Sequence, residues 1–571
     1  MLDDDTQSRS SDEPEQARPT AVARLAHSRR GFLKGMMTAA TASFGLGAGV
    51  LAAPEAAHAR GKGRRDRRRF QVFRIRSWAA RLHLAERTPR KADNGDEQRY
   101  ADQRASFSKT LPHDDLGEVD RSAYRALLRA LASREPADFE AIPLSPQADR
   151  RLANPQAAFV FDLVGRDGHA TRLPEAPAFA SAELSAEIAE VYWQALTRDV
   201  PFRAYDASPL VAAAIDDLNA LPAVLAPTEG GVVTPGTLFR GETPGDRVGP
   251  YLSQFLWHDV PYGAAPIVQR YQTPIPGDDF MTSYEEWLAI QRGAAPAASI
   301  RFDATRRYLR DARGLGEYVH VDVLFQAYYN AAMILTGFGP DALDPALPYR
   351  GSASQGGFVT FGGPHLFDLV AKAARVALGG AWYHKWCVHR RLRPEVYAGR
   401  IENHLRGAKD YGLPLDLLMS EAVARVRTQQ GNALLPMAYP EGSPTHPAYP
   451  AGHATVAGAC ATILKAFANE AFEIPDPVEA SEDGLDLLAW GGEPLTLGGE
   501  IDKLAANISL GRDAAGVHYR TDARGIEVGE SQAIGILQDY SRTYNEDFDG
   551  FTLTRFDGRR IRIVDGRVRL A

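Results

Sequence analysis

The spacing of apolar residues along the chain predicts a mainly helical protein. Between positions 70 and 225, apolar side chains recur every three or four residues, as at Tyr124, Leu127 and Leu131. The same spacing returns in later segments, which are 283–293, 303–312, 318–337 and a run from His365 to the stop at Pro394. We therefore expect helices to dominate the core.

Two segments depart from this helical pattern. Residues 226–280 are rich in proline, glycine and threonine, which predicts a long irregular segment that covers or lines part of the fold. In the tail, 551–570, apolar and polar residues alternate around two Asp-Gly pairs, at 557–558 and 565–566. Such alternation with Asp-Gly turns is typical of a small, peripheral β-meander.

The N-terminus has the order of a targeting segment. A pair of arginines, Arg29 and Arg30, precedes a run of apolar and small residues that ends at Ala53. An Ala-x-Ala triplet then ends at Ala59. This is the pattern of a twin-arginine secretory signal, so we predict that residues 1–59 are removed and that the mature protein is exported. No later segment offers the ~18 uncharged apolar residues of a membrane span.

Composition narrows the classes of function without naming one. The chain has 571 residues and a formal net charge of −7, which argues against nucleic acid as a partner. Its only cysteines are Cys387 and Cys460, so no disulfide framework is expected, and one bridge or two free thiols both fit. After the signal, we predict a helical region at 60–225 and a catalytic helical region at 226–571, joined in one compact unit.

The first of three candidate anion-binding segments lies near the end of a predicted helix. Lys385 and Arg393 are eight residues apart, so on one continuous helix both would point toward a common spot. The three basic residues between them also fit a solvated charge run, which is the more common arrangement.

The second segment, HPAYPAGH at 446–453, lies directly before a predicted helix. Gly452 and His453 would begin that helix, whose free backbone N–H groups and positive dipole end favour an oxyanion. His446 opens the segment. A single histidine is more often a satisfied polar group than a ligand, so the argument depends on how these segments combine.

The third segment places Arg512 six residues before His518. Two arginines and a lysine can hold a tetrahedral or bipyramidal oxyanion, and the histidines add a nucleophile or ligand and a proton carrier. The combination predicts an anion site with imidazole chemistry. The chain lacks the motifs G-x-S-x-G, H-E-x-x-H and G-x-x-x-x-G-K-[ST].

Together the three segments resemble the vanadium-dependent haloperoxidases, whose anion site is shared with a superfamily of acid phosphatases. The segments are KWCVHRRLRPE (385–395), HPAYPAGHA (446–454) and NISLGRDAAGVHYRTD (507–522). Other stretches, such as NGDEQRY (94–100) and GDDFMTSYEEWLAIQ (277–291), look like the algal bromoperoxidase branch, so the resemblance covers nearly all of the mature chain. It implies a mainly helical fold built on two four-helix bundles, and a homo-oligomer.

The resemblance also implies how a vanadate cofactor would be held. His518 would bond the vanadium, with Asp522 as its hydrogen-bond partner. Lys385, Arg393 and Arg512 would neutralise the equatorial oxygens, and the backbone N–H of Gly452 would help to hold them. A structural Ca²⁺, as in some algal relatives, is left open.

The remaining implied roles concern catalysis. His453 would hydrogen-bond an apical oxygen and move protons, and Lys385 would polarise the bound oxidant. His446 occupies the place where bromoperoxidases carry a second histidine, which favours bromide, with iodide also oxidised. Hydrogen peroxide, halide and small organic acceptors would be the reactants.

One position departs from the family pattern. The motif's usual serine is Ala451 here, so a hydroxyl that normally contacts an equatorial oxygen is missing. Two alternatives therefore stay open. An exported acid phosphatase would use His518 as nucleophile and His453 as acid in the same site, and a catalytically weak homologue would only bind an oxyanion.

Overall fold

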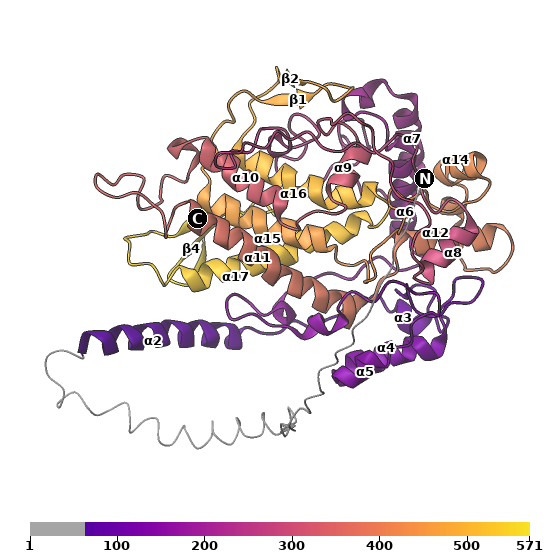
Figure 1. The fold of residues 1–571 in the computed structure, drawn as a ribbon, viewed down its shortest axis with the longest axis horizontal. Helices are drawn as coiled ribbons and strands as arrows, with labels where there is room; N and C mark the ends of the chain where they lie inside the picture. The colour runs from indigo at the N-terminus through magenta and orange to yellow at the C-terminus, as the bar shows by residue number, and fades with distance from the viewer. Residues whose placement is uncertain (1–62) are drawn as a thin grey trace, which may run out of the picture. The chain divides into compact units, whose positions relative to one another are not determined.

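The computed structural model describes residues 63–571, and the predicted signal segment lies outside them (Figure 1). Helix α2 (Gly63–Ala85) is the first described element. Residues Ile75–Ala571 form one compact unit, to which the following description applies. No helix within 63–571 has the length and hydropathy needed to cross a membrane.

One group of helices surrounds α15, which is buried along nearly all of its length (Figure 1). Its members are α10 (Gln326–Gly337), α11 (Gly363–Tyr383), α15 (Gly452–Phe467), α16 (Leu497–Ala514) and α17 (Gly525–Tyr540). Glycine permits the close approach of α15 and α17, because a Cβ at Gly529 would lie 1.9 Å from the carbonyl oxygen of Thr455. These helices share one continuous apolar core.

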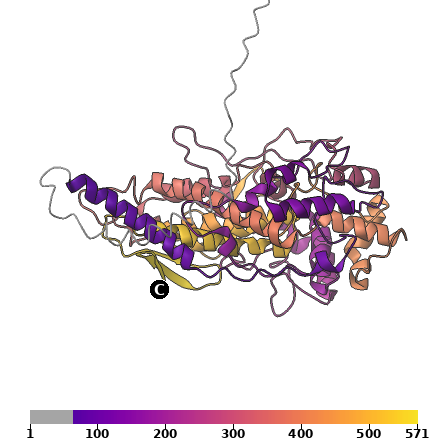
Figure 2. The ribbon, with the colours of Figure 1, turned by 90° about the horizontal axis from the view of Figure 1, so that it is seen from below.

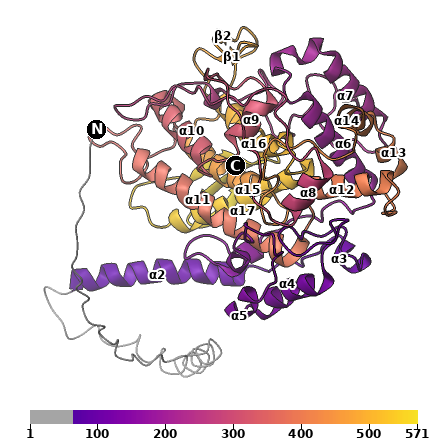
Figure 3. The same ribbon diagram turned by 45° about the vertical axis from the view of Figure 1, so that its right-hand side comes forward.

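A second group of helices has its own apolar core, centred on α6 (Figure 3). Its members are α6 (Ala182–Thr197), α7 (Pro209–Ala220), α12 (Pro394–Leu405), α13 (Leu415–Leu418) and α14 (Glu421–Gln430). Ser181 and Ser208 cap the N-termini of α6 and α7, accepting from backbone N–H groups three residues on. Helix α6 is buried along most of its length, since Tyr192 and Trp193 are fully enclosed.

Five further α-helices lie within residues 96–318. They are α3 (Asp96–Arg99), α4 (Arg121–Ser133), α5 (Pro136–Glu140), α8 (Tyr284–Gln291) and α9 (Ala312–Tyr318). The segment 226–280 is irregular as predicted, apart from a single 3₁₀ turn at Gln254–Leu256.

Two helix predictions in the middle of the chain are wrong. Residues 303–311 run in an irregular, partly extended path, and α9 begins only at Ala312 because the Asp311 side chain accepts from Gly314 N–H and so caps the helix. The helix expected from 318 begins at Gln326 instead. The intervening loop, 319–325, carries a residue of the candidate site.

The predicted mainly helical fold with a small C-terminal β-meander is confirmed. Strands β3 (Phe551–Thr554), β4 (Arg560–Val564) and β5 (Arg567–Leu570) pair antiparallel in that order, next to the C-terminus in Figure 2. The final turn has positive φ at Asp565 (47°) and Gly566 (71°), which an Asp-Gly pair tolerates. A second, two-stranded sheet, β1 (Val478–Ala480) with β2 (Leu487–Ala489), was not predicted.

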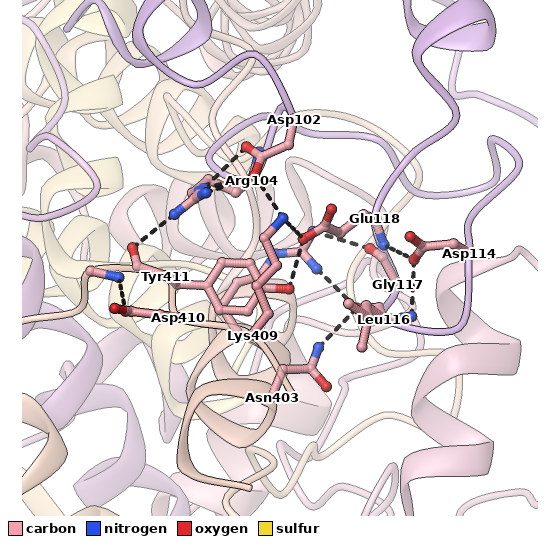
Figure 4. A network of polar contacts seen from close by, with 12 residues as sticks. Asp102, Arg104, Asp114, Leu116, Gly117, Glu118, Asn403, Lys409, Asp410 and Tyr411 are labelled. Carbon is pink, nitrogen blue, oxygen red and sulfur yellow. Dashed lines mark hydrogen bonds and ion pairs between the residues drawn. The ribbon is translucent and has the colours of Figure 1, made fainter. Parts of the chain in front are cut away.

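A polar network ties the N-terminal part of the unit to the loop after α12 (Figure 4). Lys409 Nζ donates to Asp102 Oδ2 at 2.8 Å and to Glu118 Oε1 at 2.5 Å. Glu118 also accepts from the Tyr411 hydroxyl, and Arg104 donates to the Tyr411 carbonyl. The lysine charge is therefore matched by two carboxylates.

Both cysteines are free thiols, which settles the alternative left open by the sequence. Cys460 is fully buried in α15, and its thiol donates to the carbonyl of Val370. Cys387 is partly buried, and burial raises the pKa of its thiol to about 11.

Candidate active site

The segment with Lys385 and Arg393 is not one continuous helix, contrary to the prediction. Helix α11 ends in a π-helical turn, His384–His389, and Arg390 then adopts a left-handed conformation with φ 37°. Arg393 is extended and precedes Pro394, which starts α12 rather than stopping a helix. The two cations nevertheless face the same site, because Lys385 contacts Pro447 and Ala448 and Arg393 contacts His446 in the same segment.

Lys385 is fully buried without a carboxylate partner. Its Nζ donates to the carbonyl oxygens of Pro447 at 2.7 Å and Ala448 at 2.8 Å, and it makes no ion pair within the described part of the chain. Burial, with Arg393 and Arg512 nearby, lowers the pKa of the Lys385 ammonium well below its ordinary value. An anion in contact with Nζ would restore the charged form.

Arg393 links the second and third segments. Its Nη1 donates to His518 Nε2 at 2.9 Å and to the Val517 carbonyl at 2.7 Å. Its Nε and Nη2 donate to the carbonyl oxygen and Nδ1 of His446, both at 3.0 Å. Burial lowers the pKa of the Arg393 guanidinium to about 9. All three predicted segments therefore meet at this side chain.

His518 is oriented by Asp522, as the resemblance implies. Its Nδ1–H donates to Asp522 Oδ2 at 2.7 Å, so Nε2 carries the lone pair and accepts from Arg393 Nη1 at 2.9 Å. A ligand that bonds Nε2 would take the place of this hydrogen bond. Burial lowers the pKa of His518 well below its ordinary value, and the charges of Arg393 and Lys385 lower it further. The ring is therefore neutral, the form in which histidine bonds a metal.

The N-terminus of α15 offers unoccupied backbone donors. The helix begins at Gly452, its N-cap Ala451 provides no side-chain acceptor, and no acidic residue lies in its first turn. With neither a capping side chain nor a carboxylate near its positive end, this helix start favours a bound anion.

His453 has a carboxylate partner that the sequence did not reveal. Its Nε2 lies 3.0 Å from Oδ1 and 3.2 Å from Oδ2 of Asp322, in the loop before α10. Burial and the Arg512 charge lower the pKa of His453. Burial alone would raise the pKa of Asp322, but the hydrogen bond from His453 lowers it on balance. No motif surrounds Asp322, so only the fold could identify it.

Arg512 completes the set from α16. Its Nη1 donates to the Val319 carbonyl, and its guanidinium carbon lies 5.4 Å from the ring centroid of Tyr439. Its Nε is buried and has no hydrogen-bond partner among the described residues. A donor left in this state costs free energy unless a ligand accepts from it.

The structure therefore brings together every predicted site residue. These are Lys385, Arg393, His446, Gly452, His453, Arg512 and His518. The lysine and the two arginines among them contact carbonyl oxygens and imidazoles. The nearby carboxylates of Asp322 and Asp522 accept hydrogen bonds from His453 and His518. Within residues 63–571 no group of three or more His, Cys, Asp or Glu side chains could hold a metal cation. The donor set fits an oxyanion with one imidazole ligand, whereas a structural Ca²⁺ stays a prediction.

Fold and site together define a class, a helical protein with a buried cluster of cations and imidazoles suited to an oxyanion. Curated relatives sharpen this. The chain is 37% identical over 486 residues to a vanadium-dependent bromoperoxidase of Ascophyllum nodosum, a match covering 80% of the chain and 86% of the relative. It is 36% identical over 586 residues to that of Corallina officinalis, covering 86% and 98%. The chain belongs to the vanadium-dependent bromoperoxidase family.

A solved structure supports the same assignment. The homohexameric second vanadate-dependent bromoperoxidase of Ascophyllum nodosum superimposes with a TM-score of 0.84 at 30% identity, covering 91% of this chain and 95% of that one. A scan against protein-family models finds no match. The family is therefore shown by whole-chain relatives, and the roles of individual site residues stay predictions.

Proposed function

We propose that this protein is an exported, vanadate-dependent haloperoxidase that oxidises bromide or iodide with hydrogen peroxide and so halogenates small organic acceptors. The observation that carries the proposal is a buried group of cations, Lys385, Arg393 and Arg512, that have no carboxylate partner within residues 63–571. Beside them lies His518 Nε2, which is unprotonated and accepts from Arg393. Membership of the bromoperoxidase family supports vanadate as the anion.

The residues present fit vanadate. Lys385, Arg393 and Arg512 supply up to three positive charges in a site that burial isolates from water, and the N-terminus of α15 adds backbone donors. His518 presents one neutral imidazole nitrogen as ligand. When bound, vanadate would supply a Lewis-acidic centre that activates peroxide toward halide without changing its own oxidation state.

His453 and Asp322 form the proton-handling pair of the proposed mechanism. Asp322 accepts from Nε2 of His453, which fixes the tautomer and turns Nδ1 into the acceptor. A neutral imidazole with a lowered pKa can take a proton from incoming hydrogen peroxide and release it afterwards. Asp322 stabilises the imidazolium that forms in between.

His446 supports bromide as the halide. It receives a hydrogen bond from Arg393, and its ring lies 4.8 Å from that of Trp382. Burial lowers the pKa of His446 well below its ordinary value, so the ring is neutral beside the cations. The place where bromoperoxidases carry a second histidine, according to the sequence resemblance, is thus held by a neutral imidazole.

Assembly and export belong to the same proposal. The hexameric relative supports a homo-oligomer, whose subunit number is left to measurement. The arginine pair and the Ala-x-Ala triplet in residues 1–59 support export through a twin-arginine route. Mass spectrometry of protein from the periplasm or medium tests both, by its intact mass and by a new N-terminus after Ala59.

Paired assays test the activity. Protein reconstituted with orthovanadate should brominate monochlorodimedone in the presence of bromide and peroxide, and should hydrolyse p-nitrophenyl phosphate far more slowly. His518→Ala should abolish bromination, while Lys409→Met in the distant network of Figure 4 should retain it. Phosphatase turnover without bromination would make the acid phosphatase the better assignment, and neither reaction would leave an oxyanion-binding homologue.

A further inference from the structure

Arg391 lies directly behind the oxyanion site, although it belongs to a basic run that could have been solvated. Its side chain is 2% exposed. Nη1 donates to Asp522 Oδ1 at 2.8 Å and to the Thr521 hydroxyl at 3.0 Å, and Nη2 donates to Glu187 Oε2 at 2.6 Å. The guanidinium therefore bridges two carboxylates, in the geometry that arginine satisfies and lysine does not.

Asp522 transmits this contact to the site. Its Oδ1 is held by Arg391, while its Oδ2 accepts from His518 Nδ1 at 2.7 Å and from the Tyr519 N–H at 3.2 Å. Its carbonyl oxygen accepts from the N–H of Ala451, the residue before α15. The position of Asp522 therefore sets both the plane of the His518 ring and the start of the helix that faces the anion.

Glu187, from α6, fixes Arg391 in turn. It is fully buried, and its second oxygen, Oε1, accepts from the Thr521 N–H at 2.6 Å. The Tyr519 ring covers the guanidinium, with its centroid 3.9 Å from Arg391 Cζ. A carboxylate that satisfies both a guanidinium and a backbone donor cannot be replaced by an amide without leaving two donors face to face.

A small cavity lies beside Arg391. Its volume is about 10 Å³, and it is lined in part by Asp96, His389 and Arg391. Asp96 Oδ1, His389 Nε2 and Arg391 Nε are buried there and have no hydrogen-bond partner among the described residues. This is the size and polarity of a site for one water with three partners. Such a water would connect Arg391 to a third carboxylate.

We infer that Arg391, held by Glu187, is a positioning residue of the oxyanion site, which locks Asp522 and through it the orientation of His518. Arg391 does not itself bind the anion. It acts through Asp522, which it contacts, and through His518, which Asp522 orients. The inference rests on the proposed function for the identity of the anion, but its geometry applies to any tetrahedral oxyanion in the site.

A neighbouring ion pair provides the matched control. Arg390 donates through Nε and Nη2 to Glu97 at 2.6 and 2.9 Å, and Glu97 also accepts from the Tyr124 hydroxyl. This pair has the same chemistry one residue away, but it makes no contact with Asp522 or His518. Glu97→Gln therefore removes the same charge from an arginine that is not connected to the site.

Binding of inorganic phosphate to the vanadate-free oligomer, measured by titration calorimetry, tests the inference. Glu187→Gln should lower the phosphate affinity about 10- to 100-fold, the usual effect of losing a partner behind a ligating histidine, while Glu97→Gln leaves it unchanged. The sign is diagnostic, because removal of a negative charge alone would raise the affinity for an anion. Equal affinities in the two variants would overturn the inference.

A second variant and a spectroscopic signal distinguish the loss of positioning from misfolding of Glu187→Gln. Arg391→Lys keeps the charge but cannot bridge Asp522 and Glu187, so it should lower the affinity in the same direction. The NMR resonance of the His518 Nδ1–H can be observed in protein with ¹⁵N-labelled histidine and assigned by its loss in His518→Ala. This resonance should shift in Glu187→Gln and should not shift in Glu97→Gln. An unshifted resonance in Glu187→Gln would also contradict the inference.

The outcomes separate this inference from the proposed function. Wild-type protein that binds phosphate in a Glu187-dependent way but does not halogenate would refute the haloperoxidase and leave the positioning role intact. Wild-type protein that halogenates while Glu187→Gln matches Glu97→Gln would refute only the positioning role. Wild-type protein that binds neither phosphate nor vanadate would refute both.

Discussion

Two buried lysines in this protein have almost the same surroundings and differ in one partner. Lys109 Nζ donates to the carbonyl oxygens of Glu441 and Ser443 and to the carboxylate of Glu395, all within 2.8 Å. Lys385 Nζ donates to two carbonyl oxygens at similar distances and has no carboxylate. The second lysine lacks only the anion that the first one has.

The same difference holds for the other fully buried lysines of the described chain. Lys465 pairs with Asp502 at 2.8 Å and Lys503 with Glu500 at 2.6 Å. The fold thus supplies a carboxylate to every one of its buried lysines except Lys385. In the site, the carboxylates instead accept hydrogen bonds from imidazoles: Asp322 accepts from His453, and Asp522 accepts from His518. The missing negative charge is the one that a ligand would bring.

The largest expected effect comes from breaking the paired lysine. Lys109→Met should destabilise the protein by about 3–5 kcal/mol, because Glu395 would remain buried without a counter-charge. Lys385→Met should leave the anion-free protein at least as stable as wild type, since it removes an uncompensated cation. Urea unfolding followed by circular dichroism measures both. A Lys385→Met protein as unstable as Lys109→Met would contradict the comparison.

Ligand binding sharpens the same comparison. Vanadate at 100 times its dissociation constant should stabilise the wild-type protein by about 2.7 kcal/mol, as mass action requires for a ligand of the folded state. Lys385→Met should lose most of this gain, whereas Lys409→Met, which alters a cation already paired, should keep it. Thermal unfolding with and without vanadate measures the gain. A full gain in Lys385→Met would exclude Lys385 from the anion site.

Asp322→Asn tests whether the carboxylate beside His453 supports proton transfer by that imidazole rather than anion binding. The amide keeps the shape but not the charge that stabilises imidazolium, so kcat for bromide oxidation should fall about 100-fold, the lower end of general acid–base effects. Vanadate affinity should change little, because Asp322 pairs with His453 and not with the cations. Steady-state bromination with vanadate titration separates the two. A loss of affinity at constant kcat would assign Asp322 to anion binding.

The smallest expected effect concerns the residue before α15. Ala451→Ser restores a hydroxyl at the N-cap of the helix and should strengthen oxyanion binding by about 0.5–1.5 kcal/mol, the net value of one neutral hydrogen bond. Vanadate titration of the apo protein measures it. No gain would mean that the backbone donors and cations already satisfy the oxygens.

Sequence periodicity predicted the helices with strong apolar faces. It missed the helix ends that are set by a capping side chain or by a proline. The pattern around Ile188 and Val191 becomes the buried face of α6. At 303–312 the same kind of spacing fails, because Asp311 caps a helix that starts only afterwards. Spacing also could not show that the chain turns at Arg390 and enters α12 at Pro394.

The site was predictable where residues lie in compact motifs and unpredictable where the fold supplies partners from a distance. Lys385, Arg393 and His518 stand in recognisable segments. Asp322 lies 131 positions from His453 and has no motif around it. Glu187 belongs to an ordinary helical pattern, and only the packing of α6 against the site shows that it holds Arg391.

The two thiols have a consequence for an enzyme of this kind. Hypohalous acid released beside its source attacks sulfur, and a thiol reacts chiefly as the thiolate. Cys460 is fully buried, and the raised pKa of Cys387 keeps that thiol protonated at neutral pH. Met281 and Met437 are likewise fully enclosed. Most sulfur atoms within residues 63–571 are thus out of reach of the oxidant, and among the methionines of that range Met419, at 74% exposure, should be oxidised first.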